Sequence, residues 1–167
     1  DLRVHDHPAL YAASLHPEPL QAIYFVTPEQ WKKQDLAPVR ADLIARQLNQ
    51  LGEALAALGI PFSVLTVADY QQIPARLASY CQQHEVSQLF VNRDIGIYEL
   101  ARALSVQQQC DATGIRVQWF DARCVFAPGS VLTGSKEMFK VFTPFSKAWL
   151  KKLAAEGYQD WPKPSAR

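Results

Sequence analysis

Short apolar runs alternate along this chain with longer segments in which apolar residues recur every three or four positions. The short runs are rich in aliphatic, β-branched and aromatic residues. They cover Leu20–Val26, Phe62–Val67, Leu89–Asn92 and Val117–Phe120. Runs of this length and composition predict β-strands that are buried on both faces.

The longer segments predict α-helices. The clearest helix extends from Val39 to Leu58, where leucines form a broad apolar stripe and Gly59 supplies a stop. Three further helices are predicted over Ile73–His84, Tyr98–Ala112 and Pro144–Glu156. Strands that alternate with helices predict a single α/β domain with a parallel, Rossmann-like sheet covered by helices on both faces.

In such a sheet, ligands bind beyond the carboxyl ends of the strands. Four loops therefore become candidates for a binding site. They are Thr27–Pro38, Ala68–Gln71, Arg93–Ile97 and Asp121–Pro128.

Asp6 lies between His5 and His7, a spacing that could indicate a metal site or a proton relay. Two histidines and one acid lack the remaining ligands of a metal site. Asp6 before His7-Pro8 is instead the pattern of a helix N-cap followed by an early proline. We therefore expect Asp6 to cap a helix near Pro8.

Charge and cysteine content narrow the class of protein. Lys and Arg number 17 against 16 Asp and Glu, and 49% of the residues are hydrophobic, so the composition gives no basic footprint for nucleic acid. The three cysteines are odd in number and far apart, which disfavours a disulfide framework or a zinc site. No apolar stretch reaches the length of a membrane span, and we expect a cytoplasmic protein.

Motifs for catalysis are absent from the sequence. No glycine-rich dinucleotide or phosphate-binding motif follows a predicted strand, and no serine or cysteine lies in a nucleophile elbow. Glu99 is the most suggestive carboxylate because it follows a loop at a strand end, although a first-turn acid that favours the helix dipole explains it as well. The pattern alone describes an α/β domain without a catalytic centre.

Three segments, in the right order, closely resemble the photolyase/cryptochrome family. They are Thr133–Leu153 (TGSKEMFKVFTPFSKAWLKKL), the opening Asp1–Asp6 (DLRVHD) and the loop Thr27–Trp31 (TPEQW). The pattern is most similar to the N-terminal antenna domain of bacterial photolyases that repair cyclobutane pyrimidine dimers with light.

The resemblance implies that this domain binds a methenyltetrahydrofolate antenna. In those photolyases a Glu at the start of the helix after the fourth strand hydrogen-bonds the pterin, and Glu99 matches it in place. Tyr98 stands where the family has Asn and could stack on a flat ring. Trp31 and Gln34 belong to the matching loop, and Gln34 stands where a His can occur.

The resemblance further implies a domain over residues 1–157, the start of a linker over 158–167, and a C-terminal domain beyond Arg167. That C-terminal domain would hold FAD and bind damaged DNA, so the fragment alone is expected to be inactive as a photolyase. Phe142, Thr143, Pro144 and Phe145 would form the interdomain segment, although Phe142 and Phe145 fit a local core equally well.

Family members have an apolar first strand before Asp-Leu-Arg, central in a five-stranded sheet of order 3-2-1-4-5. This strand is absent from the chain, and its loss would leave two strands with unpaired backbone groups. We expect another segment or another chain to replace it, for instance by self-association of the fragment, or the natural protein to be longer.

Two other functions remain open. The first is the antenna domain of a cryptochrome-type blue-light photoreceptor, whose downstream domain would make the difference. The second is a nucleotide-binding α/β module unrelated to light, with an adenine-nucleotide site at the strand ends.

Overall fold

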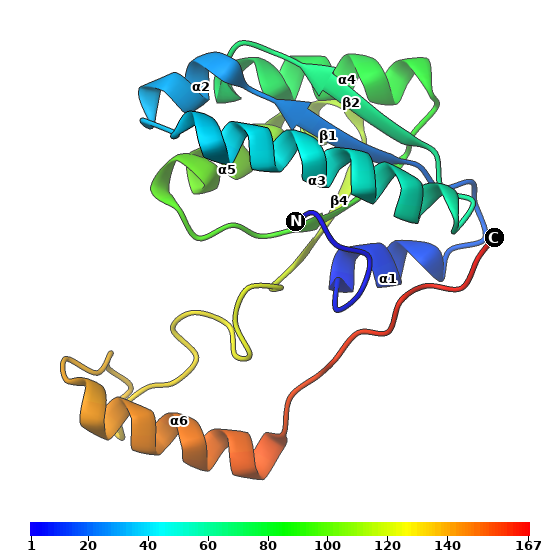
Figure 1. Ribbon diagram of the computed structural model, residues 1–167. Coiled ribbons are helices and arrows are strands. Elements are labelled where there is room, and N and C mark those ends of the chain that lie inside the picture. Colours follow the sequence, from blue (N-terminus) through cyan, green and yellow to red (C-terminus); the bar gives the residue numbers. More distant parts are fainter.

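The computed structural model describes all residues from 1 to 167 and is an α/β arrangement with a separate C-terminal helix (Figure 1). Its helices and strands, in chain order, are α1 (Pro8–Ser14), β1 (Ala22–Val26), α2 (Pro28–Lys33), α3 (Pro38–Ala56), β2 (Phe62–Thr66), the 3₁₀ helix η1 (Tyr70–Gln72), α4 (Ile73–Gln83), β3 (Gln88–Asn92), α5 (Ile97–Thr113), β4 (Arg116–Phe120) and α6 (Phe142–Glu156). Every strand and long helix that the sequence pattern predicts is present, with ends that differ by a few residues.

The strands form two separate parallel pairs. β1 pairs with β2 from Ala22 opposite Phe62, and β3 pairs with β4 from Gln88 opposite Arg116. The prediction of parallel α/β pairing is confirmed, but a continuous sheet of about five strands is not observed. No backbone hydrogen bond connects β1 with β3, so the two pairs do not join into one sheet.

The inner edges of β1 and β3 carry the unpaired backbone groups. Ala22 donates its N–H to Pro61, and Val26 accepts from Val67, so alternate residues of β1 face β2. Ile23 and Phe25 therefore direct their N–H and C=O groups to the other edge. In β3, by the same alternation, Gln88, Phe90 and Asn92 point away from β4.

One apolar cluster joins the two pairs on one face. It lies under α4 and α5, which pack side by side, and its most deeply buried members are Cys81 and Cys110. Strand residues from both pairs pack against it: Ile23, Phe25, Leu89 and Val117. The helices therefore hold the two half-sheets together where the strands do not.

A second, smaller cluster of Leu55, Leu58 and Ile60 lies where α3 ends and the chain enters β2. Val4 and Leu10 pack on it from the N-terminal segment and α1. Much of the predicted leucine stripe of α3 stays open to solvent, and the side chain of Leu43 is 50% exposed. In α3 only Leu48 and Leu55 are buried.

The start of α1 differs from the sequence expectation. His7, not Asp6, is the N-cap, and its Nδ1 accepts a hydrogen bond from the N–H of Leu10 at 3.0 Å. Asp6 adopts a left-handed conformation with φ 47° and lies 3.4 Å from Arg3. The prediction of a helix that starts near Pro8 is therefore confirmed, but its N-cap is His7, the residue directly before the proline, and not Asp6.

Residues 121–157, here called the arm, leave the α/β body and fold onto themselves. α6 contains no buried residue. Its Trp149 packs edge-on against Phe126 at 5.7 Å between ring centroids, and Phe145 packs against Phe139 at 6.0 Å. Figure 1 shows α6 set apart from the body and joined to it by two long connections.

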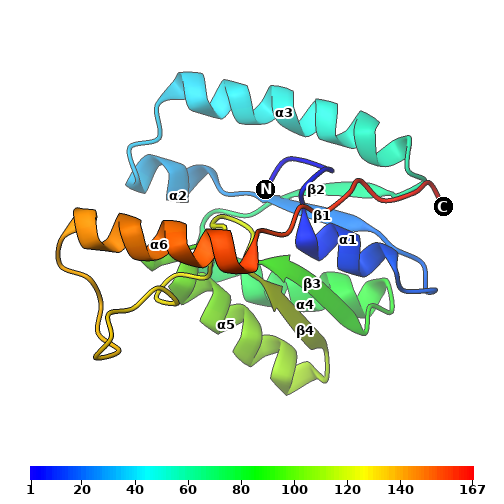
Figure 2. The same ribbon diagram turned by 90° about the horizontal axis from the view of Figure 1, so that it is seen from below.

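The tail after α6, residues 158–167, returns to the body. The N–H of Asp6 donates to the carbonyl of Trp161 at 2.8 Å, and the Trp161 ring lies 5.4 Å from that of Tyr11. At the end of the tail, the N–H of Arg167 donates to Leu58 at 3.0 Å, and its guanidinium contacts the carbonyls of His16 and Glu18. The tail follows the outside of α1 in both views (Figures 1 and 2).

The molecule is more open than a compact monomer. Its accessible surface is 10904 Å², against about 8300 Å² expected for a folded monomer of this mass. Only 18 of the 167 residues are buried, and the arm contributes none of them. The excess surface therefore includes apolar groups that could pack against another domain or chain.

Candidate functional site

The candidate site lies at the carboxyl edge of the strands. α2 begins directly after β1, η1 follows β2, and α5 begins four residues after β3. The carbonyl of Ala68 accepts the N–H groups of Glu29 and Gln30, which joins the start of α2 to the loop before η1. The loop after β4 lies there too, because β4 is parallel to β3 and Arg93 donates its N–H to Phe120, so all four loops that the sequence pattern indicated lie at one edge.

Glu99 is in the first turn of α5 and accepts a hydrogen bond from the hydroxyl of Tyr70, with Oε1 3.0 Å from the phenol oxygen. Its second oxygen lies against Gly96, the N-cap of α5, where a Cβ atom would overlap it. Gly96 therefore leaves room for the carboxylate, and Tyr70 fixes one of its oxygens.

A charged network continues from Tyr70 across the edge. The Arg102 guanidinium lies 4.7 Å from the centre of the Tyr70 ring and donates to the Asp94 carboxylate at 2.8 Å. Arg123, at the start of the arm, contacts the other oxygen of Asp94 at 2.7 Å. The network links the loop after β3, helix α5 and the chain after β4.

Burial and the acidic neighbours set the titration of the two tyrosines at this edge. Burial, together with the hydrogen bond to Glu99, raises the pKa of Tyr70 to about 12 against an opposing effect of Arg102. Burial also raises the pKa of Tyr24 in β1, near the same Arg102 and Asp94. Both phenols are therefore neutral at physiological pH, and Tyr70 is a hydrogen-bond donor.

The other residues that the sequence analysis assigned to the site are not joined to Glu99. The Tyr98 side chain is 59% exposed, Gln34 is exposed, and Trp31 is half-buried on α2. None of these three side chains makes a hydrogen bond. Tyr98 nevertheless lies next to Glu99 in the first turn of α5 and presents a free aromatic ring to solvent.

Sequence reasoning missed Tyr70, Asp94 and Arg102. Tyr70 and Asp94 do lie in two of the loops selected by the strand pattern. Arg102 follows Glu99 by three positions, which places both on one face of a helix. What no local pattern indicates is the contact between Tyr70 and Glu99, which are 29 residues apart.

A second polar group surrounds the end of β3. The amide of Asn92 donates to the Asp1 carboxylate at 2.8 Å and lies 3.2 Å from Nδ1 of His7, while its oxygen accepts the N–H of Ala9. Burial lowers the pKa of His7 to about 4. His7 is therefore neutral at pH 7 and serves as an acceptor.

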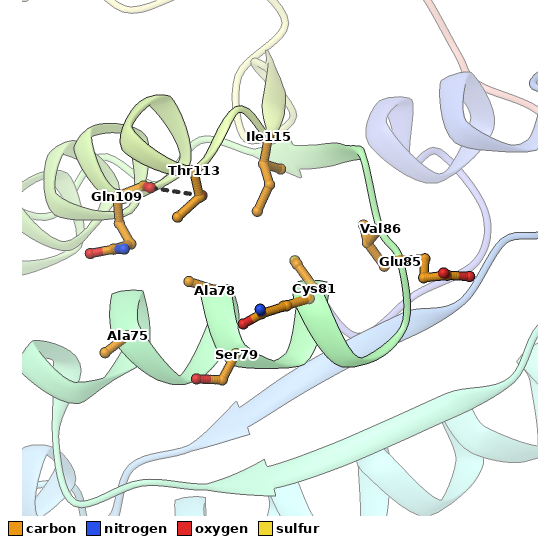
Figure 3. Close-up of a pocket in the computed structure, with 10 residues that line it drawn as sticks. Ala75, Ala78, Ser79, Cys81, Glu85, Val86, Gln109, Thr113 and Ile115 are labelled. Carbon is orange, nitrogen blue, oxygen red and sulfur yellow. Dashed lines mark hydrogen bonds between the residues drawn. The ribbon is translucent and has the colours of Figure 1, made fainter.

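A groove of about 650 Å³ lies between α4 and α5, close to Val86 and Ile115 (Figure 3). Cys81, Gln109 and Thr113 line it, and Glu99 does not. Burial, and then the neighbouring Cys110, raise the pKa of the Cys81 thiol to about 11, so the thiol is un-ionised and weakly nucleophilic at neutral pH.

No three His, Cys, Asp or Glu side chains are grouped so that they could hold a metal ion. All three cysteines are free. No helix is long and apolar enough to cross a membrane. The carboxyl edge, where Tyr70 donates a hydrogen bond to Glu99, is the candidate site.

The chain belongs to the DNA photolyase family, because residues 1–165 match the sequence pattern that defines this family. It is 43% identical over 150 residues to the deoxyribodipyrimidine photo-lyase of Vibrio cholerae, an alignment covering 90% of this chain and 32% of that protein. It is 40% identical over 168 residues to the enzyme of the same name from Salmonella typhimurium, covering 100% of this chain and 35% of that protein. The chain therefore spans about a third of the length of these relatives.

Solved structures show the same fold. A cryptochrome from Synechocystis superposes with a TM-score of 0.84 at 21% identity, covering 100% of this chain and 36% of the other. A class III photolyase from Agrobacterium tumefaciens gives 0.71 at 20% identity, with 100% and 33% covered. An archaeal photolyase from Sulfolobus tokodaii, solved with two FAD molecules, gives 0.69 at 16% identity, with 99% and 36% covered.

Proposed function

We propose that this chain is the antenna-chromophore domain of a DNA photolyase that uses light to repair cyclobutane pyrimidine dimers. The observation that carries the proposal is the 43% identity, over nine-tenths of the chain, to a protein named deoxyribodipyrimidine photo-lyase. Relatives of that name also reach 39% identity in Escherichia coli. The cryptochrome superposition concerns the fold alone, so it favours no photoreceptor role.

Glu99 and Tyr98 are the residues that we propose for chromophore binding. An ionised carboxylate accepts hydrogen bonds from ring N–H and amino groups, and the exposed Tyr98 ring offers a flat surface for stacking. Trp31 and Gln34 on and after α2 complete the proposed edge. This donor and acceptor set suits a pterin, and we therefore propose methenyltetrahydrofolate as the chromophore.

When bound, the folate would absorb near-ultraviolet or blue light and transfer the excitation to a reduced flavin. The chain's own residues bind and orient the chromophore: Glu99 supplies an acceptor, Tyr98 a stacking surface, and Arg102 with Asp94 a rigid support. We propose that FAD and the damaged DNA bind a further domain of the full-length protein. The near-neutral charge of this domain fits a minor part in DNA binding.

The arm supplies the proposed contact with that further domain. Phe142 is 76% exposed and Phe145 is half-buried beside it, with the two rings 6.3 Å apart. Thr143 and Pro144, in the first turn of α6, are exposed as well. Phe142, Thr143, Pro144 and Phe145 thus offer apolar surface, with Val141 62% exposed directly before them.

We further propose that an extended apolar segment fills the space between β1 and β3. Both edges offer unpaired N–H and C=O groups to a parallel neighbour, and the α4–α5 cluster already spans the two pairs on one face. Asp1 accepts a hydrogen bond from Asn92, the last residue of β3, and therefore lies at the end of this space where the strands have their carboxyl ends. Where no such segment is available, self-association of the 167-residue chain would satisfy the edges, which concentration-dependent light scattering would detect.

The test of the chromophore proposal is an absorption and fluorescence titration of the full-length protein with methenyltetrahydrofolate. Glu99→Gln keeps the shape of the side chain and removes its charge, and Glu53→Gln on the exposed side of α3 is the matched control. We expect saturable binding that Glu99→Gln weakens at least tenfold and Glu53→Gln leaves unchanged, because a hydrogen bond to a charged group contributes about 1.5–3 kcal/mol.

Light-dependent repair of an oligonucleotide that contains a thymine dimer tests the enzyme. Repair by the full-length protein, but not by residues 1–167, is the expected result. A full-length protein that binds flavin and repairs nothing would favour the cryptochrome role instead. Binding of an adenine nucleotide in place of any chromophore would favour a module unrelated to light.

A further inference from the structure

Tyr70 lies on a different element from Glu99, yet its phenol is the side-chain partner of the Glu99 carboxylate. We propose that Tyr70 is a positioning residue for chromophore recognition, which orients the Glu99 carboxylate toward a flat ligand with in-plane N–H donors. This inference rests on the proposed function and deepens it. It assigns a role to a residue that the sequence analysis did not select.

The first step of the argument is the freedom that a glutamate has without a partner. Glu99 lies in the first turn of α5, and ordering its three side-chain torsions costs conformational entropy. A carboxylate held in place before the ligand arrives spares the complex that loss. The Tyr70 hydroxyl supplies the restraint through one carboxylate oxygen at 3.0 Å.

The second step is that Tyr70 is itself held. Its ring lies under the Arg102 guanidinium at 4.7 Å, and Arg102 is fixed by Asp94 at 2.8 Å. Asp94 in turn receives Arg123 at 2.7 Å. Tyr70, the hydrogen-bond donor for Glu99, is therefore held in place by Arg102 on α5 and, through Arg102, by Asp94 in the loop after β3.

The third step concerns protonation. A phenol positions a carboxylate only while it keeps its proton, since a phenolate would repel it. Burial and the bond to Glu99 raise the pKa of Tyr70 to about 12, so the donor persists throughout the pH range in which the protein would work.

The test is a double-mutant cycle in the full-length protein with methenyltetrahydrofolate as the probe. Wild type, Tyr70→Phe, Glu99→Ala and the double variant are compared by the Kd from fluorescence titration and by the absorption maximum of the bound folate. Tyr80→Phe is the matched control, because its hydroxyl contacts Gln21 at 3.0 Å and Ser63 at 2.9 Å at the opposite edge of the sheet.

We expect Tyr70→Phe to raise the Kd roughly fivefold to tenfold and to shift the absorption maximum of the bound folate. In the Glu99→Ala background, where the acceptor of the Tyr70 hydroxyl is missing, the same change should have little further effect, since Tyr70 acts through Glu99. Tyr80→Phe should lower only the stability of the protein, which separates positioning from a general structural role.

A Tyr70→Phe variant with the wild-type Kd, or with an equal loss in the presence and absence of Glu99, would overturn the positioning role and leave the antenna proposal intact. A wild-type protein that binds no folate would instead overturn the antenna proposal together with this inference. The two failures are thus distinguished by the wild-type titration alone.

Discussion

The α/β body and the arm contain similar helices but use their apolar residues in opposite ways. In the body, α4 and α5 bury Cys81 and Cys110 to 1% exposure against strands from both half-sheets. In the arm, α6 buries nothing, and its Phe142 is 76% exposed. That a segment forms a helix therefore does not show which contacts stabilise it. The apolar residues of the arm are free to pack against a partner outside the α/β body.

The largest difference in the free energy of unfolding should come from truncating one leucine to alanine in each region. Leu55 in α3 is 2% exposed, whereas Leu150 in α6 is 58% exposed. We expect Leu55→Ala to lower the free energy of unfolding by about 2–5 kcal/mol and Leu150→Ala by less than about 0.5 kcal/mol. Urea unfolding of residues 1–167 measures both. Equal losses would show that α6 is packed in solution and would end the contrast.

Protonation should destabilise the body through His7. Its pKa is lowered from 6.5 to about 4 in the folded chain, so the unfolded chain takes up a proton first as the pH falls. The free energy of unfolding should have its full value above about pH 6.5. It should decrease by on the order of 2 kcal/mol toward pH 4, after allowance for the partial exposure of His7. Unfolding curves across this range measure the loss. His7→Ser, which retains a capping oxygen, should flatten the profile; an unchanged slope would assign the loss to other groups.

Two glycines, one in each region, should affect chromophore binding differently. A Cβ at Gly96 in the body would overlap the Glu99 carboxylate, while a Cβ at Gly134 in the arm meets nothing within 4 Å. We expect Gly96→Ala to displace Glu99 from Tyr70 and weaken folate binding about tenfold, and Gly134→Ala to leave it unchanged. Fluorescence titration of the full-length protein decides, and equal affinities would exclude Glu99 from the site.

The smallest effect should show whether the tail is docked on the body. Gly59 and Gly114 have left-handed φ values of 73° and 72°, but only at Gly59 would a Cβ come within 2.7 Å of the Arg167 carbonyl oxygen; at Gly114 it would meet nothing within 4 Å. Alanine should cost about 1–2 kcal/mol at either site, with about 1 kcal/mol more at Gly59 from the lost tail contact. Thermal or urea unfolding measures the difference. The difference between the two glycine variants should vanish in a chain that lacks residues 158–167. A difference that persists in the shortened chain would argue against the contact of the tail with the body.

Much of the fold could be predicted from local pattern. The apolar runs marked all four strands, and the period of Val39–Leu58 marked α3. The pattern did not show how many leucines of α3 would be buried, because that depends on what lies opposite the helix. Nor did it identify His7 as the cap, since the choice between Asp6 and His7 follows from the left-handed turn at Asp6, to whose N–H Trp161 supplies the acceptor.

The candidate site could be predicted only in outline. The rule that ligands bind at strand ends selected the loops that contain Tyr70 and Asp94. The interdomain role of Phe142–Phe145 and the linker at residues 158–167 stay predictions, as does the assignment of Tyr98, Trp31 and Gln34. Their side chains lie at a surface where a missing ligand or domain would decide the contacts.

By itself, the sequence determined which segments become helices and strands and to which family the chain belongs, because periodicity, capping residues and motifs are local properties of the chain. The tertiary structure alone decided that Tyr70 meets Glu99 across 29 residues, that Arg102 supports Tyr70, and that the strands divide into two pairs. These contacts depend on how the parallel strands align their carboxyl ends and on whether a neighbour is present to satisfy their edges.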